Sequence, residues 1–265
     1  MNAIDISVII PTYKPAAYIW ECLDSIKNQT FDRRRFEIII ILNGCDAPFR
    51  EQIQQYIHQK LADYNICFLQ TDTAGVSNAR NLGLDMAQGE YIGFIDDDDY
   101  VSPSYLEELY QVASDGSTPI SYTLAKYDST GEIKPFYVTR LFDRNYGKGS
   151  RKITSVRSFF SGPCVKLVRR SAIGKRRFDV NLANGEDGLF MFEISDAIDR
   201  ISLTSKNAIY YRRYRENSAI SRKLTMSLHL YLILQYCTVY SHNIKAYNFV
   251  FFLSRIIASL RNIVA

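Results

Sequence analysis

The chain has 265 residues, of which 47% are hydrophobic and 13% aromatic, so it can form the core of one large α/β domain and is not intrinsically disordered. Its five cysteines are widely spaced, odd in number and never in a CxxC pair, so we expect reduced thiols in the cytosol, without disulfides or a zinc site. No basic-then-apolar leader opens the chain, and no apolar run reaches about 18 residues, so we expect neither secretion nor a membrane span.

Charge is distributed unevenly along the chain. The net charge is +4, yet nine Lys or Arg residues and only one acid occur from Ser205 onward. The body of the chain is therefore mildly acidic, whereas its last quarter is basic and rich in aromatic residues.

Short apolar strands alternate with amphipathic helices through the first 120 residues. Strands are expected at 6–13, 36–42, 66–70 and 91–95, and the first should stop at Pro11 because proline cannot continue a central ladder. Helices are expected at 18–28, 47–63 and 75–87, and Ser102 and Pro103 should open another as N-cap and first residue. This alternation predicts a mostly parallel sheet with helices on both faces.

Beyond about residue 120 the pattern is looser. Strands are expected at 121–127, 134–139, 165–168 and 207–214, with a polar loop at 143–152 and a helix at 185–195. One or two helices that are apolar on more than one face should occupy 224–264. We therefore divide the chain into a main domain at 1–222 and a basic, aromatic helical extension at 223–265.

Four consecutive carboxylates, Asp96 to Asp99, follow the apolar strand at 91–95. A buried strand cannot also bury four unpaired anions, because each would cost several kcal/mol of desolvation. We therefore expect the cluster where the strand leaves the sheet, at the edge where parallel sheets bind ligands. Asp98, or Asp96 together with Asp98, suits a hard divalent cation that also binds a diphosphate. A solvated acidic turn is the alternative.

Three further stretches are candidates for chemistry. Glu186 and Asp187 open a helix, where acids either complement the helix dipole or supply a base that deprotonates a hydroxyl. Arg80 lies on the helix at 75–87 and by itself is typical of a solvated helix arginine. The arginines of segment 211–218 could neutralise a phosphate, line an acceptor site or touch anionic lipid.

Four motifs in the same order and spacing resemble the family 2 inverting glycosyltransferases with the GT-A fold. They occupy 7–13, 75–83, 89–99 and 185–187, and the similarity covers roughly residues 4 to 220. The resemblance implies a GT-A domain with a mostly parallel central sheet flanked by helices. It also implies transfer of a hexosyl or hexosaminyl group from a nucleoside-diphosphate donor, expected to be a UDP-sugar. The acceptor would be a hydroxyl of a saccharide or lipid-linked saccharide in surface polysaccharide synthesis.

The resemblance assigns several residues to the nucleotide pocket. Pro11, Thr12 and Tyr13 would line this pocket, with Tyr13 against the base. Asn43 stands where the family usually has an aspartate that hydrogen-bonds the base or ribose, and its amide offers both a donor and an acceptor. Arg80 would face the diphosphate or support the Asp cluster.

The carboxylate cluster matches the family's Asp-x-Asp region. Asp98 would be the best ligand for Mn²⁺ or Mg²⁺, with Asp96 as a second ligand. Asp96 and Asp97 would also contact the donor, and Asp99 would only cap the following helix.

The resemblance also implies a mechanism. Asp187 matches the catalytic base, and Glu186 is its neighbour that helps to place the acceptor. Arg213 and Arg215 belong to a stretch, 213–218, that resembles a loop closing over the donor. Attack by the deprotonated acceptor opposite the leaving nucleoside diphosphate would invert the anomeric centre.

Two alternatives to this function are a catalytically degenerate relative that acts as a binding or scaffold subunit, and a sugar-1-phosphate nucleotidyltransferase. The second would need a glycine-rich loop after the first strand, where this chain has Pro-Thr-Tyr-Lys-Pro. We expect a cytoplasmic protein, peripheral at the inner face of the membrane if residues 224–264 bind a membrane surface. Alternatively, these helices pack on the domain itself or on a second subunit. We do not expect a nucleic-acid partner.

Overall fold

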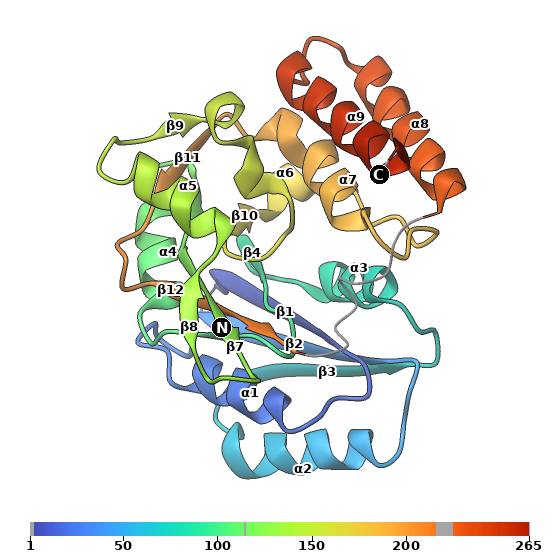
Figure 1. Ribbon diagram of the computed structural model, residues 1–265. Helices are drawn as coiled ribbons and strands as arrows, with labels where there is room; N and C mark the ends of the chain where they lie inside the picture. Colours follow the sequence, from blue (N-terminus) through green and yellow to red (C-terminus); the bar gives the residue numbers. More distant parts are fainter. Residues whose placement is uncertain (1–2, 114, 216–224, 265) are drawn as a thin grey trace.

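A five-stranded sheet forms the centre of the computed structural model (Figure 1), which describes residues 3–113, 115–215 and 225–264. Its strand order is β10-β4-β1-β2-β3. Strands β1 to β4 pair in parallel, and β10 lies antiparallel to β4 at one edge. In chain order these strands span Ile6–Thr12, Phe36–Asn43, Asn65–Thr71, Tyr91–Phe94 and Leu167–Arg169. The predicted mostly parallel sheet is confirmed.

Helices cover both faces of this sheet, because successive side chains of a strand point to opposite sides. Val8 and Ile10 of β1 pack in one apolar cluster with α1 (Tyr18–Lys27), α2 (Phe49–Lys60) and α4 (Tyr105–Ala113). Ile9 packs in the other cluster, with α3 (Val76–Met86) and with helix α7 (Glu186–Glu193). Both clusters are fully apolar and buried, so the sheet holds the strand ends in fixed positions.

The prediction that the first strand stops at Pro11 is wrong. The strand β1 continues to Thr12, which pairs with Leu42 of β2. Its pairing with β4 has already ended at Ile9. Pro11 therefore lies where β1 has a neighbouring strand on one side only, and such an edge position tolerates the missing N–H.

Two smaller sheets extend the fold beyond β4. One has the order β5-β12-β7-β8 and the other β6-β11-β9. The members of the first span Tyr100–Val101, Ile209–Tyr214, Tyr122–Tyr127 and Ile133–Pro135, and those of the second Thr118–Ile120, Arg200–Leu203 and Arg151–Lys152. Strand β12 pairs with both β5 and β7, so it runs directly beside the segment that follows the acidic cluster.

The predicted helix start at Ser102 and Pro103 is also wrong, since α4 begins at Tyr105. The Ser102 hydroxyl donates a hydrogen bond to the Asn207 carbonyl oxygen (2.7 Å) and accepts one from the Ile209 N–H (2.8 Å). Ser102 thus fastens the end of β5 to β12. A residue more than a hundred positions away has displaced the local capping role.

The region predicted as a strand at 134–139 and a loop at 143–152 instead contains helix α5 (Tyr137–Asn145) after β8. The Thr139 hydroxyl accepts a hydrogen bond from the Phe136 N–H (2.7 Å) and donates one to the Thr123 carbonyl oxygen. These bonds satisfy the helix start and attach it to β7. Val138 and Phe142 are buried at helical spacing, a period that the short apolar stretch did not reveal.

The remaining helices lie on one side of the sheet, and the C-terminal pair packs against α7 (Figure 1). They are the 3₁₀ helices η1 (Ile153–Ser155), η2 (Arg157–Phe160) and η3 (Ile194–Ala197), and the α-helices α6 (Arg170–Ile173), α8 (Met226–His242) and α9 (Phe249–Val264). Among the described residues, no helix combines the length and apolarity that a membrane span requires. The predicted boundary at 222/223 lies outside the described residues.

The outer faces of α8 and α9 carry exposed apolar side chains, including Leu230, Leu234, Leu253 and Ile257. No acidic residue occurs between Met226 and Val264. The expected contact of this pair with a membrane surface or a second subunit stays a prediction.

Candidate active site

A cavity of about 810 Å³ opens at the carboxyl ends of β1, β2 and β4. Every residue predicted for the site lines it, although the residues come from six separate stretches of the chain. They are Pro11, Thr12, Tyr13, Asn43, Arg80, Asp96, Asp97, Asp98, Glu186, Asp187, Arg213 and Arg215. The structure therefore brings them together, and their individual roles stay predictions.

At the nucleotide end of the cavity, Asn43 ties the strand ends together. Its Nδ2 donates a hydrogen bond to the Thr12 carbonyl oxygen (2.7 Å), and its Oδ1 accepts one from the Gly75 N–H (2.9 Å). Asn43 is buried, so both amide atoms already serve the protein backbone. Tyr13, in contrast, is 50% exposed, and it presents an aromatic side chain at the cavity wall.

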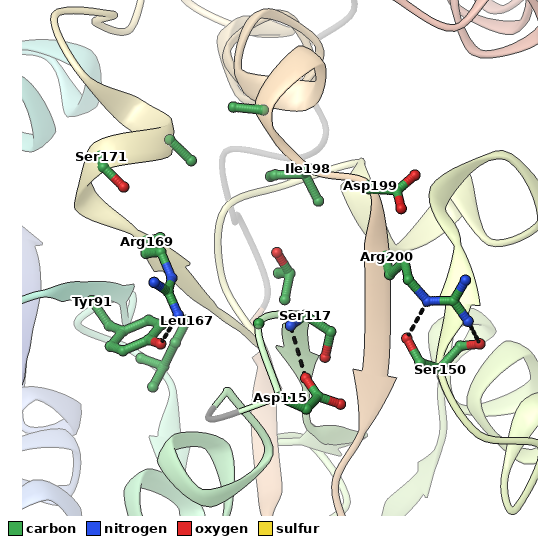
Figure 2. A pocket seen from close by; sticks show the side chains of 14 residues that line it. Tyr91, Asp115, Ser117, Ser150, Leu167, Arg169, Ser171, Ile198, Asp199 and Arg200 are labelled. Carbon is green, nitrogen blue, oxygen red and sulfur yellow. Dashed lines mark hydrogen bonds between the residues drawn. The ribbon is translucent and has the colours of Figure 1, made fainter.

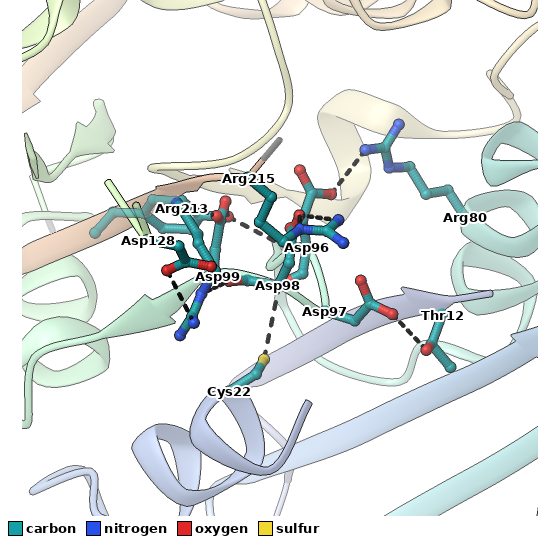
Figure 3. Close-up of polar contacts among 11 residues, drawn as sticks. Thr12, Cys22, Arg80, Asp96, Asp97, Asp98, Asp99, Asp128, Arg213 and Arg215 are labelled. Atoms are coloured by element: carbon teal, nitrogen blue, oxygen red, sulfur yellow. Dashed lines mark hydrogen bonds and ion pairs between the residues drawn. The ribbon is translucent and has the colours of Figure 1, made fainter. Parts of the chain in front are cut away.

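The acidic cluster faces this cavity, and Figure 3 shows how its members diverge. Asp97 accepts a hydrogen bond from the Thr12 hydroxyl (2.5 Å), while Arg215 Nε (2.9 Å) and Nη2 (2.5 Å) both bind Asp98 Oδ2. Burial raises the pKa of Asp97 to about 7, a shift that the Thr12 hydrogen bond opposes and that Asp98 and Asp96 increase. Burial and the neighbouring Asp96 raise the pKa of Asp98.

The prediction that Asp99 caps the following helix is wrong. The Asp99 side chain is buried, and it accepts hydrogen bonds from the Tyr210 hydroxyl (2.6 Å) and the Arg213 N–H (2.7 Å). Burial raises its pKa well above the ordinary value, and Asp98 and Asp96 add to the shift. Asp99 therefore anchors β12 beside the cluster, at the wall of the cavity.

The cluster has the donor set of a hard divalent cation. Within the described residues, no three His, Cys, Asp or Glu side chains converge to hold a metal ion by themselves. Asp96 and Asp98 nevertheless offer carboxylate oxygens to one cavity, and burial destabilises the charged form of Asp98. A Mg²⁺ or Mn²⁺ ion that takes its other ligands from a diphosphate and water fits such a pair.

Arg80 connects the acidic cluster to the start of α7. Its Nη2 binds Asp96 Oδ1 (3.0 Å) and its Nη1 binds Asp187 Oδ1 (2.6 Å), with Glu186 Oε1 at 3.8 Å. The guanidinium is buried over the Phe178 ring, 5.3 Å from the ring centroid. Burial lowers the pKa of Arg80, but the carboxylates of Asp187 and Asp96 raise it by more. The net pKa lies above the ordinary arginine value, so the side chain stays charged. The interpretation of Arg80 as a solvated helix arginine is therefore wrong.

Asp187 lies in the first turn of α7. Arg80 binds its Oδ1, and its Oδ2 faces Gly162 in the wall of a small pocket. This pocket, of about 80 Å³, is lined by Asp187, Phe136, Tyr137 and the segment 161–165. Burial raises the pKa of Asp187, and Arg80 lowers it. Burial and Asp187 raise the pKa of Glu186 to about 7. Because its pKa is raised, the Asp187 carboxylate is a stronger base than an exposed aspartate and suits proton transfer.

Sequence reasoning missed the small pocket, because its wall depends on a buried lysine. Lys166 Nζ donates hydrogen bonds to the carbonyl oxygens of Gly162 (2.5 Å) and Cys164 (2.7 Å). These bonds fix the segment 161–165 beside Asp187. The sequence offers no signal for this role, since a lysine next to an apolar strand usually reads as a surface residue.

The C-terminal helices hold the start of α7 in place. Gly185, which precedes Glu186, has a φ of 89°, and a Cβ added to it would lie 2.7 Å from Leu232 Cδ1 of α8. A Cβ on Gly188 would lie 3.1 Å from the Tyr236 hydroxyl. Arg255 of α9 donates a hydrogen bond to the Phe160 carbonyl oxygen of η2. The pair α8 and α9 therefore contacts both the α7 start and the segment before the small pocket.

We expect Gly185→Ala to lower both stability and sugar transfer. A left-handed alanine costs about 1–2 kcal/mol, and the clash with Leu232 would shift the turn that carries Asp187. Gly131→Ala is the matched control, because Gly131 has a φ of 69° and nothing within 4 Å of an added Cβ. Thermal melting should show a loss in both variants, and transfer should fall only in Gly185→Ala. Equal transfer by the two variants would contradict the inference that α8 holds the Asp187 turn in place.

A second cavity, of about 440 Å³, lies at the opposite end of β4 (Figure 2). It contains none of the predicted residues. Its arginines are engaged, since Arg169 Nη2 donates to the Tyr91 hydroxyl (2.8 Å) and Arg200 donates to the Ser150 hydroxyl (3.0 Å) and carbonyl oxygen (2.6 Å). We therefore place the site at the carboxyl ends of the strands.

Comparison with known proteins gives one family and one fold. The family model described as "Glycosyl transferase family 2" matches residues 7–177. The chain is 27% identical to the putative glycosyltransferase EpsH of Bacillus subtilis, over 82% of this chain and 63% of the relative. It is 27% identical to the glycosyltransferase GlyA of Streptococcus pneumoniae, over 78% of this chain and 30% of the relative.

Two Staphylococcus aureus TarS crystal structures share the fold. The complex of TarS 1-349 with UDP-GlcNAc superposes with a TM-score of 0.77 at 22% identity, over 98% of this chain and 72% of that one. The complex with UDP has a TM-score of 0.72 at 21% identity, over 97% and 71%. The poly(ribitol-phosphate) beta-N-acetylglucosaminyltransferase TarS is itself 26% identical in sequence, over 81% of this chain and 36% of the relative. The chain spans less than two-thirds of the length of EpsH, GlyA and TarS.

Proposed function

This chain belongs to glycosyl transferase family 2, and from that premise we propose that it is a metal-dependent, inverting enzyme that uses a UDP-sugar. The family match and the shared fold confirm the predicted glycosyltransferase class and GT-A fold. The acceptor in this proposal is a hydroxyl of a saccharide or lipid-linked saccharide in surface polysaccharide synthesis. The names of two relatives support that acceptor class, since one is a minor teichoic acid biosynthesis protein and the other a poly(ribitol-phosphate) beta-N-acetylglucosaminyltransferase.

The observation that carries this proposal is the arrangement of carboxylates around Arg80. One guanidinium holds Asp96 on the side of the strand end and Asp187 on the side of the small pocket. A donor diphosphate beside Asp96 and an acceptor hydroxyl beside Asp187 would thus approach the sugar from opposite sides. Inverting transfer requires this opposition, because the new bond forms on the face opposite the breaking one.

Asp187 acts as the base in the proposed reaction. It takes the proton of the acceptor hydroxyl while that oxygen forms a bond to C1 of the sugar. The bond between C1 and the diphosphate oxygen breaks, and its electron pair leaves with UDP. Because burial raises the pKa of Asp187 while Arg80 keeps the carboxylate ionised, the group is a stronger base than an exposed aspartate.

Asp98 and Asp96 would hold Mn²⁺ or Mg²⁺, and the bound ion would supply positive charge to the leaving diphosphate. Arg80 and Arg215 reach the same carboxylates from the protein side. Arg215 is the last described residue before the segment 216–224, so residues 216–218 of the predicted donor-closing loop lie outside the described residues.

The donor is best tested with a panel of nucleotide sugars. We expect the purified protein to release UDP from a UDP-sugar in the presence of Mn²⁺ or Mg²⁺, above the rate in EDTA and above the rate with GDP-sugars. The TarS crystal complexes, one with UDP and one with UDP-GlcNAc, and the exposed Tyr13 ring support this choice. Preferential turnover of another nucleotide would contradict the UDP assignment. Donor binding without turnover would support a catalytically degenerate binding subunit, and absence of both with every donor would support a scaffold subunit.

A further inference from the structure

The arginine side chains in and directly after strand β12 lie on two different sides of the site. Arg213 and Arg215 belong to one side, where each has carboxylate partners. Arg213 binds Glu21 and Asp128 (3.2 Å), and Arg215 binds Asp98 (2.5 Å). Because alternate residues of a strand point to opposite faces, Arg212 belongs to the other side, together with Tyr210 and Tyr214.

The Arg212 side chain has no carboxylate partner within ion-pair distance among the described residues, and its guanidinium donates no hydrogen bond to any of them. Its guanidinium lies over the rings of Phe136 (5.2 Å to the centroid) and Tyr214 (5.8 Å). It lines both the large cavity and the small pocket beside Asp187. Burial lowers the pKa of Arg212, but Asp99 and Asp96 raise it, so the group is charged. A half-buried charged guanidinium with unused donors is suited to an anionic ligand.

Among the arginines of β12, only Arg212 lines the small pocket as well as the large cavity, which indicates the acceptor side of the site. The nucleotide end of the cavity is formed by Thr12, Tyr13 and Asn43, and the diphosphate end by the acidic cluster with Arg80 and Arg215. Arg212 also lines the small pocket, together with Phe136 and Tyr137. An oxyanion there would lie on the side from which the acceptor hydroxyl reaches Asp187.

We propose that the acceptor carries a phosphate ester near the hydroxyl that is glycosylated, and that Arg212 binds this phosphate. The inference rests on the proposed function, since it assigns a chemical class to the acceptor of the same site. A planar guanidinium binds two phosphate oxygens at once, and the neighbouring aromatic rings can cover the carbon skeleton of a sugar or polyol. Phosphodiester-linked polyols and lipid-linked sugar diphosphates both supply this chemistry.

The test uses the full chain saturated with UDP and Mn²⁺, so that the donor subsite is filled. Binding of glycerol 3-phosphate is measured by calorimetry, with glycerol as the neutral counterpart. We expect wild-type protein to bind glycerol 3-phosphate and not glycerol. Arg212→Gln should weaken this binding about ten- to a hundredfold and Arg212→Lys less, because lysine keeps the charge but loses the paired donors. Arg34→Gln removes an exposed arginine far from the cavity and should leave binding unchanged.

Failure of wild-type protein to bind glycerol 3-phosphate, or equal binding by Arg212→Gln, would overturn the proposal. If Arg212→Gln does not melt cooperatively, Arg212→Lys and the comparison of glycerol 3-phosphate with glycerol decide. Titration of UDP into the same wild-type protein separates this inference from the proposed function. Failure of wild-type protein to bind UDP counts against the donor assignment alone. Transfer to a polyol-phosphate oligomer and to a polyprenyl diphosphate-linked sugar then distinguishes the two sources of the phosphate.

Discussion

Replacing Asp187 by asparagine is expected to reduce sugar transfer about a hundred- to ten-thousandfold, the range that general base catalysis contributes. Asparagine has the same shape, and its Oδ1 can still accept the hydrogen bond that Arg80 Nη1 gives to Asp187 Oδ1 at 2.6 Å. The fold and the UDP-sugar affinity should therefore survive, while the group loses its ability to take a proton. The measurement pairs transfer rates with donor binding by calorimetry.

The pH dependence of the same variant gives a second readout. The base must be ionised, so wild-type transfer falls as the pH drops through the pKa of Asp187, which burial raises above the ordinary aspartate value. This acidic limb should disappear from the residual activity of Asp187→Asn. Asp63→Asn, at an exposed carboxylate paired with Arg33, is the matched control. Near-normal transfer by Asp187→Asn would show that another group is the base.

The position of the site was predictable because it follows from strand order. The apolar run before Asp96 can only be a buried strand, and parallel strands place their carboxyl ends at one edge. Thr12, Asn43 and Asp96 therefore had to lie together, although they are separated by tens of residues. Their convergence needed no knowledge of any side-chain contact.

The partners within the site were not predictable, since they depend on contacts between distant parts of the chain. Asp99 looked like a helix cap but bonds Tyr210 and the backbone of Arg213, more than a hundred residues away. Arg80 looked like a surface residue until α7 placed Asp187 against it. Local patterns fix which face a side chain occupies but not what covers that face.

Removing the divalent metal is expected to abolish UDP-sugar turnover, and Asp98→Ala should weaken Mn²⁺-dependent donor binding about ten- to a hundredfold. The expected size corresponds to the loss of one of two carboxylate ligands, with the substrate diphosphate retaining its own contacts. Donor affinity is measured by calorimetry in Mn²⁺ and in EDTA. Wild-type protein should bind more tightly in Mn²⁺, and Asp98→Ala should lose most of that difference.

Asp98 also binds Arg215, so a second variant has to separate the two roles. Arg215 Nε and Nη2 contact Asp98 Oδ2 at 2.9 and 2.5 Å. Arg215→Gln removes this ion pair but leaves the carboxylate free for a cation. If Asp98 is the metal ligand, Arg215→Gln keeps the difference in affinity between Mn²⁺ and EDTA, whereas Asp98→Ala does not. If both variants lose the same affinity whether or not Mn²⁺ is present, Asp98 acts only by holding Arg215, and the metal site must be assigned to other ligands.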